Sequence, residues 1–452
     1  MAGLENLAQD LKPMTRVAVI GAGYAGMAAA TALATQGAAV TVFERSRLPG
    51  GRARALEAHG ATVDNGQHIL IGAYRETLSL MRQVGADPQR LLLRLPLTLA
   101  YPGQLRIAAP RLPAPLHLAL ALLGAQGLSW ADKFAAIHFM GALKRHDFRL
   151  PAGTADHSVA ALLDAHRQPA RLRTYLWEPL CVAALNTPAE AASAQVFLNV
   201  LRDSLAAARP CSDLLLPRVD LGAMFPLPAA DYVAARGGQL LLDTAIQAVD
   251  CAAGDGYTLL AEDGSRRNYS HVVIATAPYH VPALIDRLPQ LDALRHALGE
   301  LRYQPIITCY LGYPPQVRLS AAMLGHAGGV MQWLFDRGQL GGPAGLLAAV
   351  ISARGRHLEL SNQELAERIH AEIAGIVPNL PAPLWSQVIT EKRATFSCTP
   401  GLVRPATATP LPGLLLAGDY VASDYPATLE SAVRSGLQAA ASTLCQTPAD
   451  QA

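Results

Sequence analysis

The sequence predicts an α/β fold in which a discontinuous domain with a parallel sheet is joined to a mixed α+β domain. Residues 17–44 read as an apolar strand, a glycine turn, a helix and a second strand. Residues 271–276 and 413–419 add further apolar strands, and the stretches between are helical or alternate strands with helices. A strand that runs through a helix into the next strand is the unit of a doubly wound parallel sheet.

The glycine turn has the spacing G-x-G-x-x-G at Gly21, Gly23 and Gly26. In a Rossmann-like unit the first glycine permits a tight turn, the second lets the backbone approach a pyrophosphate, and the third lets helix and strand pack closely. Unpaired amides at the start of the helix favour an anion there. We therefore expect this loop, with Tyr24 and Ala25, to bind the diphosphate of a dinucleotide.

An acidic residue follows the loop at the expected interval. Glu44 ends the second strand, where a carboxylate accepts hydrogen bonds from an adenosine ribose, and Arg45 comes next. A glutamate there disfavours a 2′-phosphorylated cofactor. Downstream, Gly50 and Gly51 precede Arg52, whose guanidinium is expected to pair with the same diphosphate. The alternative for Arg52 is a solvated side chain on a surface turn.

Composition limits the classes of protein. The 452 residues suggest two or three domains. Apolar residues make up 51% and charged residues 16%, which indicates an apolar ligand or a membrane contact unless the alanine and leucine content alone explains it. The net charge of +2 predicts no nucleic-acid partner. The six cysteines form no CxxC pair, so we expect neither a metal site nor a disulfide framework.

The sequence predicts a cytoplasmic protein without a transmembrane helix. Its first residues, MAGLENLAQDLKPMTR, lack the apolar segment of a secretory signal. No uninterrupted apolar run reaches the ~20 residues that a spanning helix needs. The nearest such run, Leu116–Gly124, is expected at most to dip into a bilayer.

The middle of the chain is predicted to be helical at residues 74–85 and again from 116 to about 207, with short strands near 61–63 and in the proline-rich stretch 91–115. Ser129 and Asp132 predict a capping box. The residues that then share one helical face are Trp130, Phe134, Ile137 and Gly141. We interpret this stripe as core rather than as a lipid tunnel.

Strand patterns return at Gly237 and continue through a hairpin with the turns AGDG and EDGS. Val249 in this hairpin is a candidate to back an adenine edge, although a plain hairpin explains the pattern equally. Residues 280–391 alternate helices with strands. In the last stretch, Gly418 and Asp419 resemble the strand end that hydrogen-bonds a ribityl chain in flavin enzymes. A helix containing residues 430–436 is then expected to direct its amides at the flavin ring.

Taken together, these segments resemble the amine oxidase and phytoene desaturase superfamily of FAD enzymes. The resemblance rests on GAGYAG, Glu44, PGGR at 49–52, ATAP at 275–278 and AGDY at 417–420. It implies FAD rather than NAD. It also implies an FAD-binding domain from residues 14–98, 226–285 and 396–445, and a substrate-binding domain with a helical insertion from residues 99–225 and 286–395.

Three longer stretches are similar to the hydroxysqualene dehydroxylase branch of this superfamily: DNGQHILIGAYRETL at 64–78, LWEPLCVAALNT at 176–187, and AGDYVASDYPATLESAVRSG at 417–436. The resemblance implies reduction of hydroxysqualene to squalene by reduced FAD, in the synthesis of hopanoid precursors. It also implies an apolar isoprenoid substrate and peripheral contact with the inner membrane.

Other functions stay open at this point. A carotenoid or phytoene desaturase would use the flavin in the oxidising direction on a similar polyene. An amine oxidase would oxidise a small amine. A prenyl-binding escort protein would share the architecture without using flavin, and it would purify colourless.

The catalytic residues are less well defined by the sequence than the cofactor loop. His68, near Asp64, lies in a loop that could face the flavin. Glu178 lies in a helix, with Asn186, that could line a pocket. Asp424 and Tyr425 follow the Gly-Asp turn, where Asp424 could instead cap the next helix. We take His68, Glu178, Asp424 and Tyr425 as the candidate acids.

Overall fold

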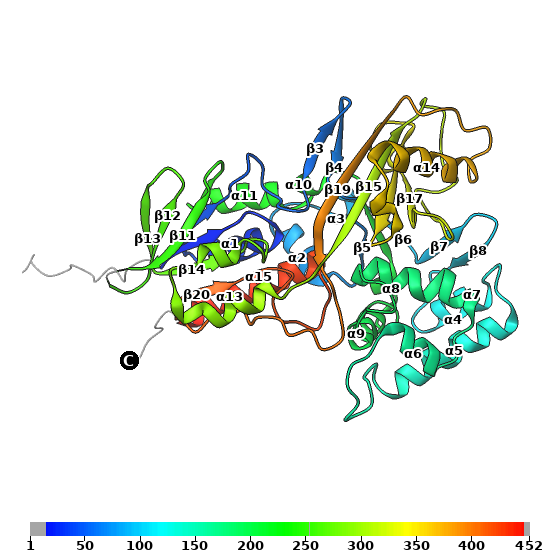
Figure 1. Ribbon diagram of the computed structural model, residues 1–452, viewed down its shortest axis with the longest axis horizontal. Coiled ribbons are helices and arrows are strands. Elements are labelled where there is room, and N and C mark those ends of the chain that lie inside the picture. The colour runs from blue at the N-terminus through cyan, green and yellow to red at the C-terminus, as the bar shows by residue number, and fades with distance from the viewer. Residues whose placement is uncertain (1–14, 253, 447–452) are drawn as a thin grey trace, which may run out of the picture.

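The computed structural model describes residues 15–252 and 254–446 (Figure 1). Most of the N-terminal stretch discussed above, and Ala253 of the AGDG turn, lie outside these residues. Within them, no helix is both long and apolar enough to cross a membrane.

A five-stranded parallel sheet forms one end of the molecule. Its order is β10-β2-β1-β14-β20. The strands are β1 (Arg16–Ile20), β2 (Ala39–Phe43), β10 (Gln239–Leu241), β14 (His271–Ile274) and β20 (Leu414–Leu416). The strands predicted near residues 17, 271 and 413 thus lie side by side, although they are far apart in the chain.

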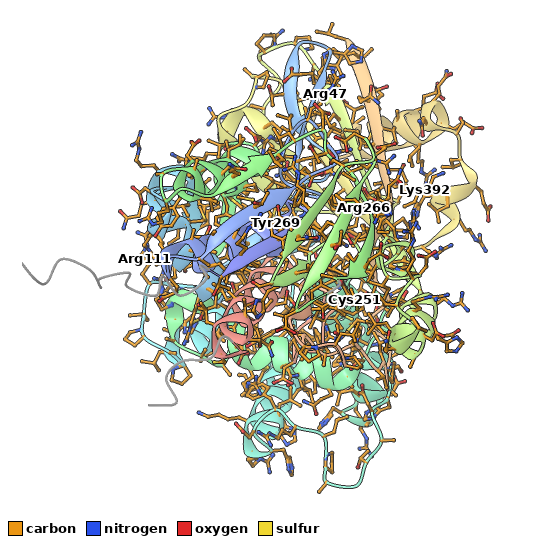
Figure 2. All side chains as sticks on the ribbon, turned by 90° about the vertical axis from the view of Figure 1, so that its left-hand side faces the viewer. Arg47, Arg111, Cys251, Arg266, Tyr269 and Lys392 are labelled. Atoms are coloured by element: carbon orange, nitrogen blue, oxygen red, sulfur yellow. The ribbon has the colours of Figure 1, made fainter. Side chains whose placement is uncertain are left out.

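The alanine-rich helix α1 (Tyr24–Thr35) is buried along most of its length, because α11 (Pro226–Ala234) and α15 (Leu429–Gln446) pack against it. Small side chains allow such close approach, which accounts for part of the high alanine content. A meander of β11 (Ile246–Cys251), β12 (Tyr257–Ala261) and β13 (Arg266–Tyr269) lies beside this sheet. Figure 2 shows that side, with Cys251, Arg266 and Tyr269 labelled.

A second, antiparallel sheet has the order β16-β17-β18-β15-β19. Its strands are β15 (Tyr303–Gly312), β16 (Met323–Gly325), β17 (Trp333–Asp336), β18 (Leu346–Ser352) and β19 (Trp385–Phe396). The side chains alternate between two apolar clusters. Leu334 and Ala349 pack on the side of α14 (Asn362–Ala374), whereas Trp333 and Phe335 face the opposite side.

Three small sheets accompany the two larger ones. They contain β3 (Ala55–Ala58) with β4 (Ala61–Asp64), β7 (Thr98–Tyr101) with β8 (Leu105–Ala108), and β5 (Leu70–Ile71) with β9 (Leu214–Pro217) and β6 (Leu92–Leu95). Strand β9 comes from a range expected in the substrate-binding domain, yet it pairs with strands from the range expected to bind FAD.

A helical layer occupies the end of the molecule opposite the parallel sheet (Figure 1). It contains α4 (Leu116–Leu123), α5 (Trp130–Arg145), α6 (Val159–Ala165), α7 (Ala170–Leu172), the π-helix η1 (Arg173–Trp177), α8 (Glu178–Leu185) and α9 (Ala194–Ser204). The remaining helices are α2 (Arg75–Gln83), α3 (Pro88–Leu91), α10 (Leu221–Met224), α12 (Val281–Leu284) and α13 (Asp292–Gly299), with the short turns η2 (Arg209–Ser212), η3 (Pro289–Leu291), η4 (Arg337–Leu340) and η5 (Arg356–Glu359).

Helix α5 confirms one prediction and contradicts another. The Ser129 hydroxyl accepts from the Asp132 amide, and the Asp132 carboxylate accepts from the Ser129 amide, so the capping box is present. The stripe interpreted as core is wrong, because Trp130 and Phe134 are each 63% exposed, and Ile137 is exposed as well. The core contact is made by a second apolar face that contains Ala136, Phe139 and Leu143.

Candidate functional site

A cavity of about 790 Å³ lies between the parallel sheet and the antiparallel sheet. It begins at the carboxyl ends of β1 and β2, where open α/β sheets bind ligands. The residues expected from the sequence that line it are Gly21, Gly23, Tyr24, Ala25, Glu44, Arg45, Gly50, Gly51, Arg52, His68, Gly418 and Asp419. Segments from near both ends of the chain are therefore brought to one site.

The three motif glycines have different structural roles. Gly21 has φ of +108°, which favours glycine, and a Cβ on Gly26 would lie 1.9 Å from the Gly21 carbonyl oxygen. Gly26 thus serves the packing of α1 and does not line the cavity. A Cβ on Gly23 would meet only Gly51 and Gly50, at 3.9 Å or more. Gly23 therefore leaves open space at the N-terminus of α1, where the helix dipole favours a phosphate.

The Glu44 carboxylate is fixed at the end of β2. Its oxygens accept from the amides of Ala22, at 2.8 Å, and Ser46, at 2.9 Å. The side chain is buried in the protein but forms part of the cavity wall. An acceptor held in this way fits a ribose hydroxyl. Glu262 and Gln247 line the same cavity.

Arg52 has partners within the protein. Its Nη2 donates to Asp419 Oδ1 at 2.6 Å, and its Nη1 donates to the Ala394 carbonyl oxygen at 2.6 Å. Asp419, through the ion pair and hydrogen bond, raises the pKa of Arg52 against the lowering effect of burial. Arg52 therefore ties the Gly-Asp turn to β19, and the structure shows no guanidinium held free for a diphosphate at this position.

Several buried polar atoms in the cavity wall have no hydrogen-bond partner in the described part of the protein. They are Arg54 Nε, Gln67 Nε2 and Thr276 Oγ1. Buried polar groups are almost always hydrogen-bonded in folded proteins. These atoms, with the space beside Gly23 and the carboxylate of Glu44, fit a long ligand that carries phosphate, ribose and further polar groups.

The loop after β4 places one candidate acid in the cavity. His68 Nδ1 lies 2.9 Å from the Gly66 carbonyl oxygen, which can only accept, so Nδ1 carries the hydrogen and Nε2 is left available. Burial lowers the pKa of His68, and the charge of Arg52 adds to this effect. Gln67 accepts from the buried Arg337 through Oε1, which leaves its Nε2 as a donor. Asp64 does not line the cavity, because its carboxylate accepts from the Leu221 amide.

The other end of the cavity is apolar. It is lined by Ile306, Trp333, Phe335 and Val350 from the antiparallel sheet and by Ala183 and Ala184 of α8. Asn186, buried beside this end, donates to Thr395 Oγ1 and accepts from the Ala353 amide. The cavity thus passes from a polar, phosphate-binding end to an apolar end.

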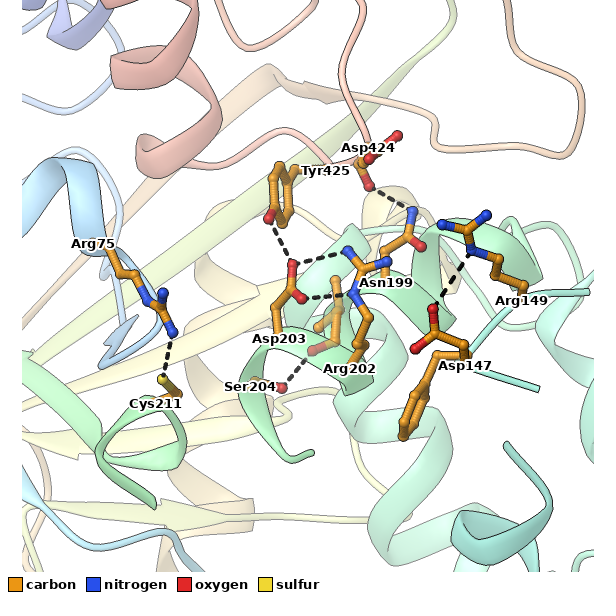
Figure 3. Close-up of polar contacts among 12 residues, drawn as sticks. Arg75, Asp147, Arg149, Asn199, Arg202, Asp203, Ser204, Cys211, Asp424 and Tyr425 are labelled. Atoms are coloured by element: carbon orange, nitrogen blue, oxygen red, sulfur yellow. Dashed lines mark hydrogen bonds and ion pairs between the residues drawn. The ribbon is translucent and has the colours of Figure 1, made fainter. Parts of the chain in front are cut away.

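Three of the four expected acids lie elsewhere, which corrects the sequence interpretation. Glu178 is ion-paired with Arg173 at 3.0 Å and does not line the cavity. The Tyr425 hydroxyl donates to Asp203, which also pairs with Arg202 (Figure 3). The Glu178 carboxylate and the Tyr425 hydroxyl are thus both paired with other side chains of the protein.

Asp424 is exposed, and its backbone carbonyl accepts from Asn199 (Figure 3). It lines a separate cavity of about 340 Å³ that contains Arg404. It does not cap α15 either, because Thr428 Oγ1 accepts the amide of Ser431 there.

The expectation for Val249 is also corrected. Its side chain is fully buried in the core, and Ile246 and Gln247 of the same strand line the cavity instead. The sequence interpretation also missed Gln67, Trp333, Phe335 and Glu391 as lining residues. Alternation in β17 signals that Trp333 and Phe335 share a face, but it does not say what that face meets.

Comparison with known proteins agrees with this geometry. Residues 24–444 match the family described as flavin containing amine oxidoreductase. The chain belongs to that family. The protein is therefore a flavin-containing oxidoreductase, and since its glycine loop and Glu44 form a dinucleotide site, its flavin is FAD.

Curated relatives match nearly the whole length of this chain. A hydroxysqualene dehydroxylase of Rhodopseudomonas palustris is 30% identical over 94% of this chain and 97% of its own. The enzyme of the same name from Zymomonas mobilis is 28% identical over 93% and 97%. A zeta-carotene desaturase of Zea mays is 25% identical over 95% and 83%.

Among solved structures, a redesigned putrescine oxidase superposes with a TM-score of 0.73 at 19% identity, covering 96% of this chain and all of that one. At this identity the match shows the fold, which is the amine oxidase type with an α/β cofactor domain predicted from the sequence.

Proposed function

We propose that this protein reduces hydroxysqualene to squalene in the synthesis of hopanoid precursors. The observation that carries the proposal is the apolar end of the cavity, which continues directly from the FAD-binding end. An apolar, chain-like substrate suits Ile306, Trp333, Phe335 and Val350. The two hydroxysqualene dehydroxylases are 28% and 30% identical to this chain and the zeta-carotene desaturase is 25% identical, which supports the choice of hydroxysqualene.

The reaction requires an alcohol to lose its oxygen. The C–O bond of an allylic alcohol breaks when a proton reaches the oxygen, because water is a better leaving group than hydroxide. The products are water and a delocalised carbocation, which an aromatic, water-poor pocket stabilises. When bound and reduced, FAD supplies the hydride that forms the new C–H bond.

His68 is our candidate for the proton donor. It is the one expected acid that lines the cavity, and its Nε2 faces no protein partner among the contacts of the described residues. Because its pKa is lowered, the imidazole is mostly neutral at neutral pH and must first take up a proton. Glu391, half-buried in the same wall, is the second candidate.

Anaerobic mixing of pre-reduced protein with hydroxysqualene tests the proposal. Squalene should form as the absorbance of oxidised flavin returns. If the oxidised protein instead introduces double bonds into a more saturated polyene and the reduced form leaves the alcohol untouched, the protein is a desaturase. A colourless protein that binds prenyl chains without turnover would support the escort alternative.

The low solubility of the proposed substrate also indicates where in the cell the protein acts. A C30 hydrocarbon alcohol is nearly insoluble in water, so a protein without a spanning helix in its described part must collect it from a membrane or a carrier. We propose a cytoplasmic protein in peripheral contact with the inner membrane.

A further inference from the structure

Two neighbouring helices and the turn before them present an apolar surface to solvent. This α4–α5 surface consists of Leu112, Leu116, Leu120, Leu123, Trp130, Phe134 and Ile137, all of which are exposed. Single exposed apolar side chains are common, but a contiguous set is typical of an interaction site. Because these side chains gather in one short segment, on two helices that contact each other, they require an explanation.

The helices cannot bury this surface in their own core, because their other faces are already packed. The buried side chains include His117 and Ala121 on α4 and Ala136, Phe139 and Leu143 on α5. Lys133 joins the two helices: its Nζ donates to the Leu123 carbonyl oxygen at 2.7 Å and lies 4.8 Å from the centre of the Trp130 ring. A cation at the end of α4 is favourable, and it holds Trp130 outward.

The charge around the surface is positive. Residues 111–149 contain five Lys or Arg side chains and two acidic ones, and one of the acidic ones, Asp132, is used in the capping box. Arg111 before α4 and Lys144 with Arg145 at the end of α5 are exposed. The segment therefore has a net charge of +3.

The positive charge distinguishes between two partners that could cover the α4–α5 surface, a second copy of the chain and a lipid bilayer. A second copy related by a two-fold axis would place the same positive segment against itself, which is repulsive. A bilayer with anionic headgroups attracts the basic rim, at about 1 kcal/mol for each Lys or Arg near the surface, while its hydrocarbon accepts the leucines and aromatics.

The surface also connects to the cavity. Ala121 and Ala125 beneath it belong to the same apolar cluster as Trp333, Phe335 and Val350 of the cavity wall. Tyr175 and Leu176 of η1 pack against this cluster, and Tyr101 lies between Tyr175, at 5.3 Å, and Trp333, at 6.0 Å. A π-helix at this place is consistent with a functional segment.

We propose that the α4–α5 surface docks on an anionic phospholipid bilayer, and that the isoprenoid substrate passes beneath α4, along η1, to the apolar end of the cavity. The docking and the route rest on the substrate class of the proposed function. They add to it the partner, the residues that meet it, and the direction of approach.

Vesicle flotation tests the docking. Wild-type protein should float with vesicles of phosphatidylcholine and phosphatidylglycerol more than with phosphatidylcholine alone. Phe134→Glu should reduce the bound fraction at least about tenfold, since it replaces an exposed aromatic that would enter the bilayer with a charge that anionic lipids repel. The matched control is Leu384→Glu, because Leu384 is 69% exposed away from this surface and should float like wild type. Equal binding of both variants would overturn the proposal.

Trp130 gives a second readout in a Trp385→Phe background, because Trp177 and Trp333 are buried and Trp385 is the other partly exposed tryptophan among the described residues. The emission of Trp130 should shift to the blue when vesicles are added and should be quenched by brominated lipid chains. If light scattering shows that wild-type protein is a dimer and that Phe134→Glu is a monomer, the occupant is a second copy and the docking proposal fails.

Activity assays separate this proposal from the proposed function. With hydroxysqualene dissolved in detergent, wild-type protein and Phe134→Glu, both with pre-reduced flavin, should reduce it at similar single-turnover rates. With hydroxysqualene in vesicles, Phe134→Glu should be at least about tenfold slower. No turnover by wild-type protein in either medium rejects the proposed function. Normal turnover by the variant in vesicles rejects the docking surface alone.

Discussion

Gly23 and Gly26 lie one helical turn apart, yet an added methyl group meets different surroundings at each. At Gly23 the methyl group has ordinary contacts, so Gly23→Ala should fold normally and lose flavin, because the methyl group occupies the space of the diphosphate. Gly26→Ala should unfold at a markedly lower temperature, since its Cβ overlaps the Gly21 carbonyl. Flavin content per protein and thermal unfolding distinguish them. Full flavin occupancy in Gly23→Ala would contradict the placement of the cofactor.

Asp64 should make stability depend on pH. Burial raises its pKa from 3.8 to about 6, so the folded state binds more protons than the unfolded state between these values. This contribution to stability is present at low pH and is lost as the pH rises through about 6. Asp64→Asn keeps an acceptor for the Leu221 amide without the charge. Relative to wild type it should gain on the order of 3 kcal/mol above pH ~7, roughly half of that near pH ~5, and little below pH ~4.

Urea unfolding at a series of pH values checks this expectation. The exposed Asp255→Asn serves as the control and should follow wild type throughout. A difference between Asp64→Asn and wild type that does not change with pH would show that the carboxyl is not protonated in the way we describe.

His68 should affect the pH profile of the reaction. If protonated imidazole is the donor, kcat should fall as the pH rises through a value below the usual 6.5, because burial lowers the pKa. His68→Gln should lower kcat and remove this dependence while flavin content stays near that of wild type. Glu391→Gln should leave the profile unchanged. If Glu391→Gln removes the pH dependence of kcat and His68→Gln leaves it in place, the Glu391 carboxyl is the proton donor.

At the scale of elements, Glu430 of α15 holds the start of α2. Its carboxylate accepts from the amides of Glu76 and Thr77 and from the Thr77 hydroxyl, and it pairs with Arg434 at 2.8 Å. Glu430→Ala should destabilise the protein by roughly 1–3 kcal/mol for each buried group left unpaired. It should also weaken flavin binding, since Tyr74 before α2 lines the cavity.

A matched control for Glu430 is Glu364→Ala, which removes half of an exposed capping box on α14 and should cost about 1 kcal/mol or less. Urea unfolding gives both values. Equal losses would mean that the contact between α15 and α2 contributes no more than a surface cap.

The sequence predicts individual helices and strands better than it predicts what each of them packs against. Strand β1, helix α1 and strand β2 follow from local patterns, because their glycines, periodicity and terminal acid all lie between Val17 and Glu44. The stripe of Trp130 and Phe134 followed helical periodicity correctly but was assigned to the wrong side. A helix with two apolar faces gives no local sign of which one meets the core.

The same limit applies to the site. The residues of the cofactor loop were predictable because the motif itself defines their geometry. Of the proposed acids, only His68 reaches the cavity, since the position of Glu178 and Tyr425 depends on Arg173 and Asp203, which no spacing rule connects to them. The position of Trp333 and Phe335 in the cavity wall follows from the register of the antiparallel sheet, which the sequence alone does not define.

At the scale of the whole molecule, the cavity wall comes from both sheets, so bound cofactor should hold them together. Removal of FAD should lower the unfolding temperature, and added FAD should restore it, with a gain of ~2.7 kcal/mol when its concentration is 100 times Kd. FMN lacks the adenosine part that Glu44 and the glycine loop would bind, so it should restore less. Equal recovery with FMN would contradict the assignment of that end.

The order of strands in the parallel sheet also constrains how the protein is made. Strand β1 pairs with β14, which comes from the second half of the chain, and β14 pairs with β20, which ends at Leu416. During translation the glycine loop and β2 emerge first, whereas β14 follows in the second half of the chain, and β20, the Gly-Asp turn and α15 are synthesised last. The nascent chain therefore cannot complete its flavin cradle until nearly all of it has left the ribosome, and until then the apolar β1 and α1 must be protected by other partners such as chaperones.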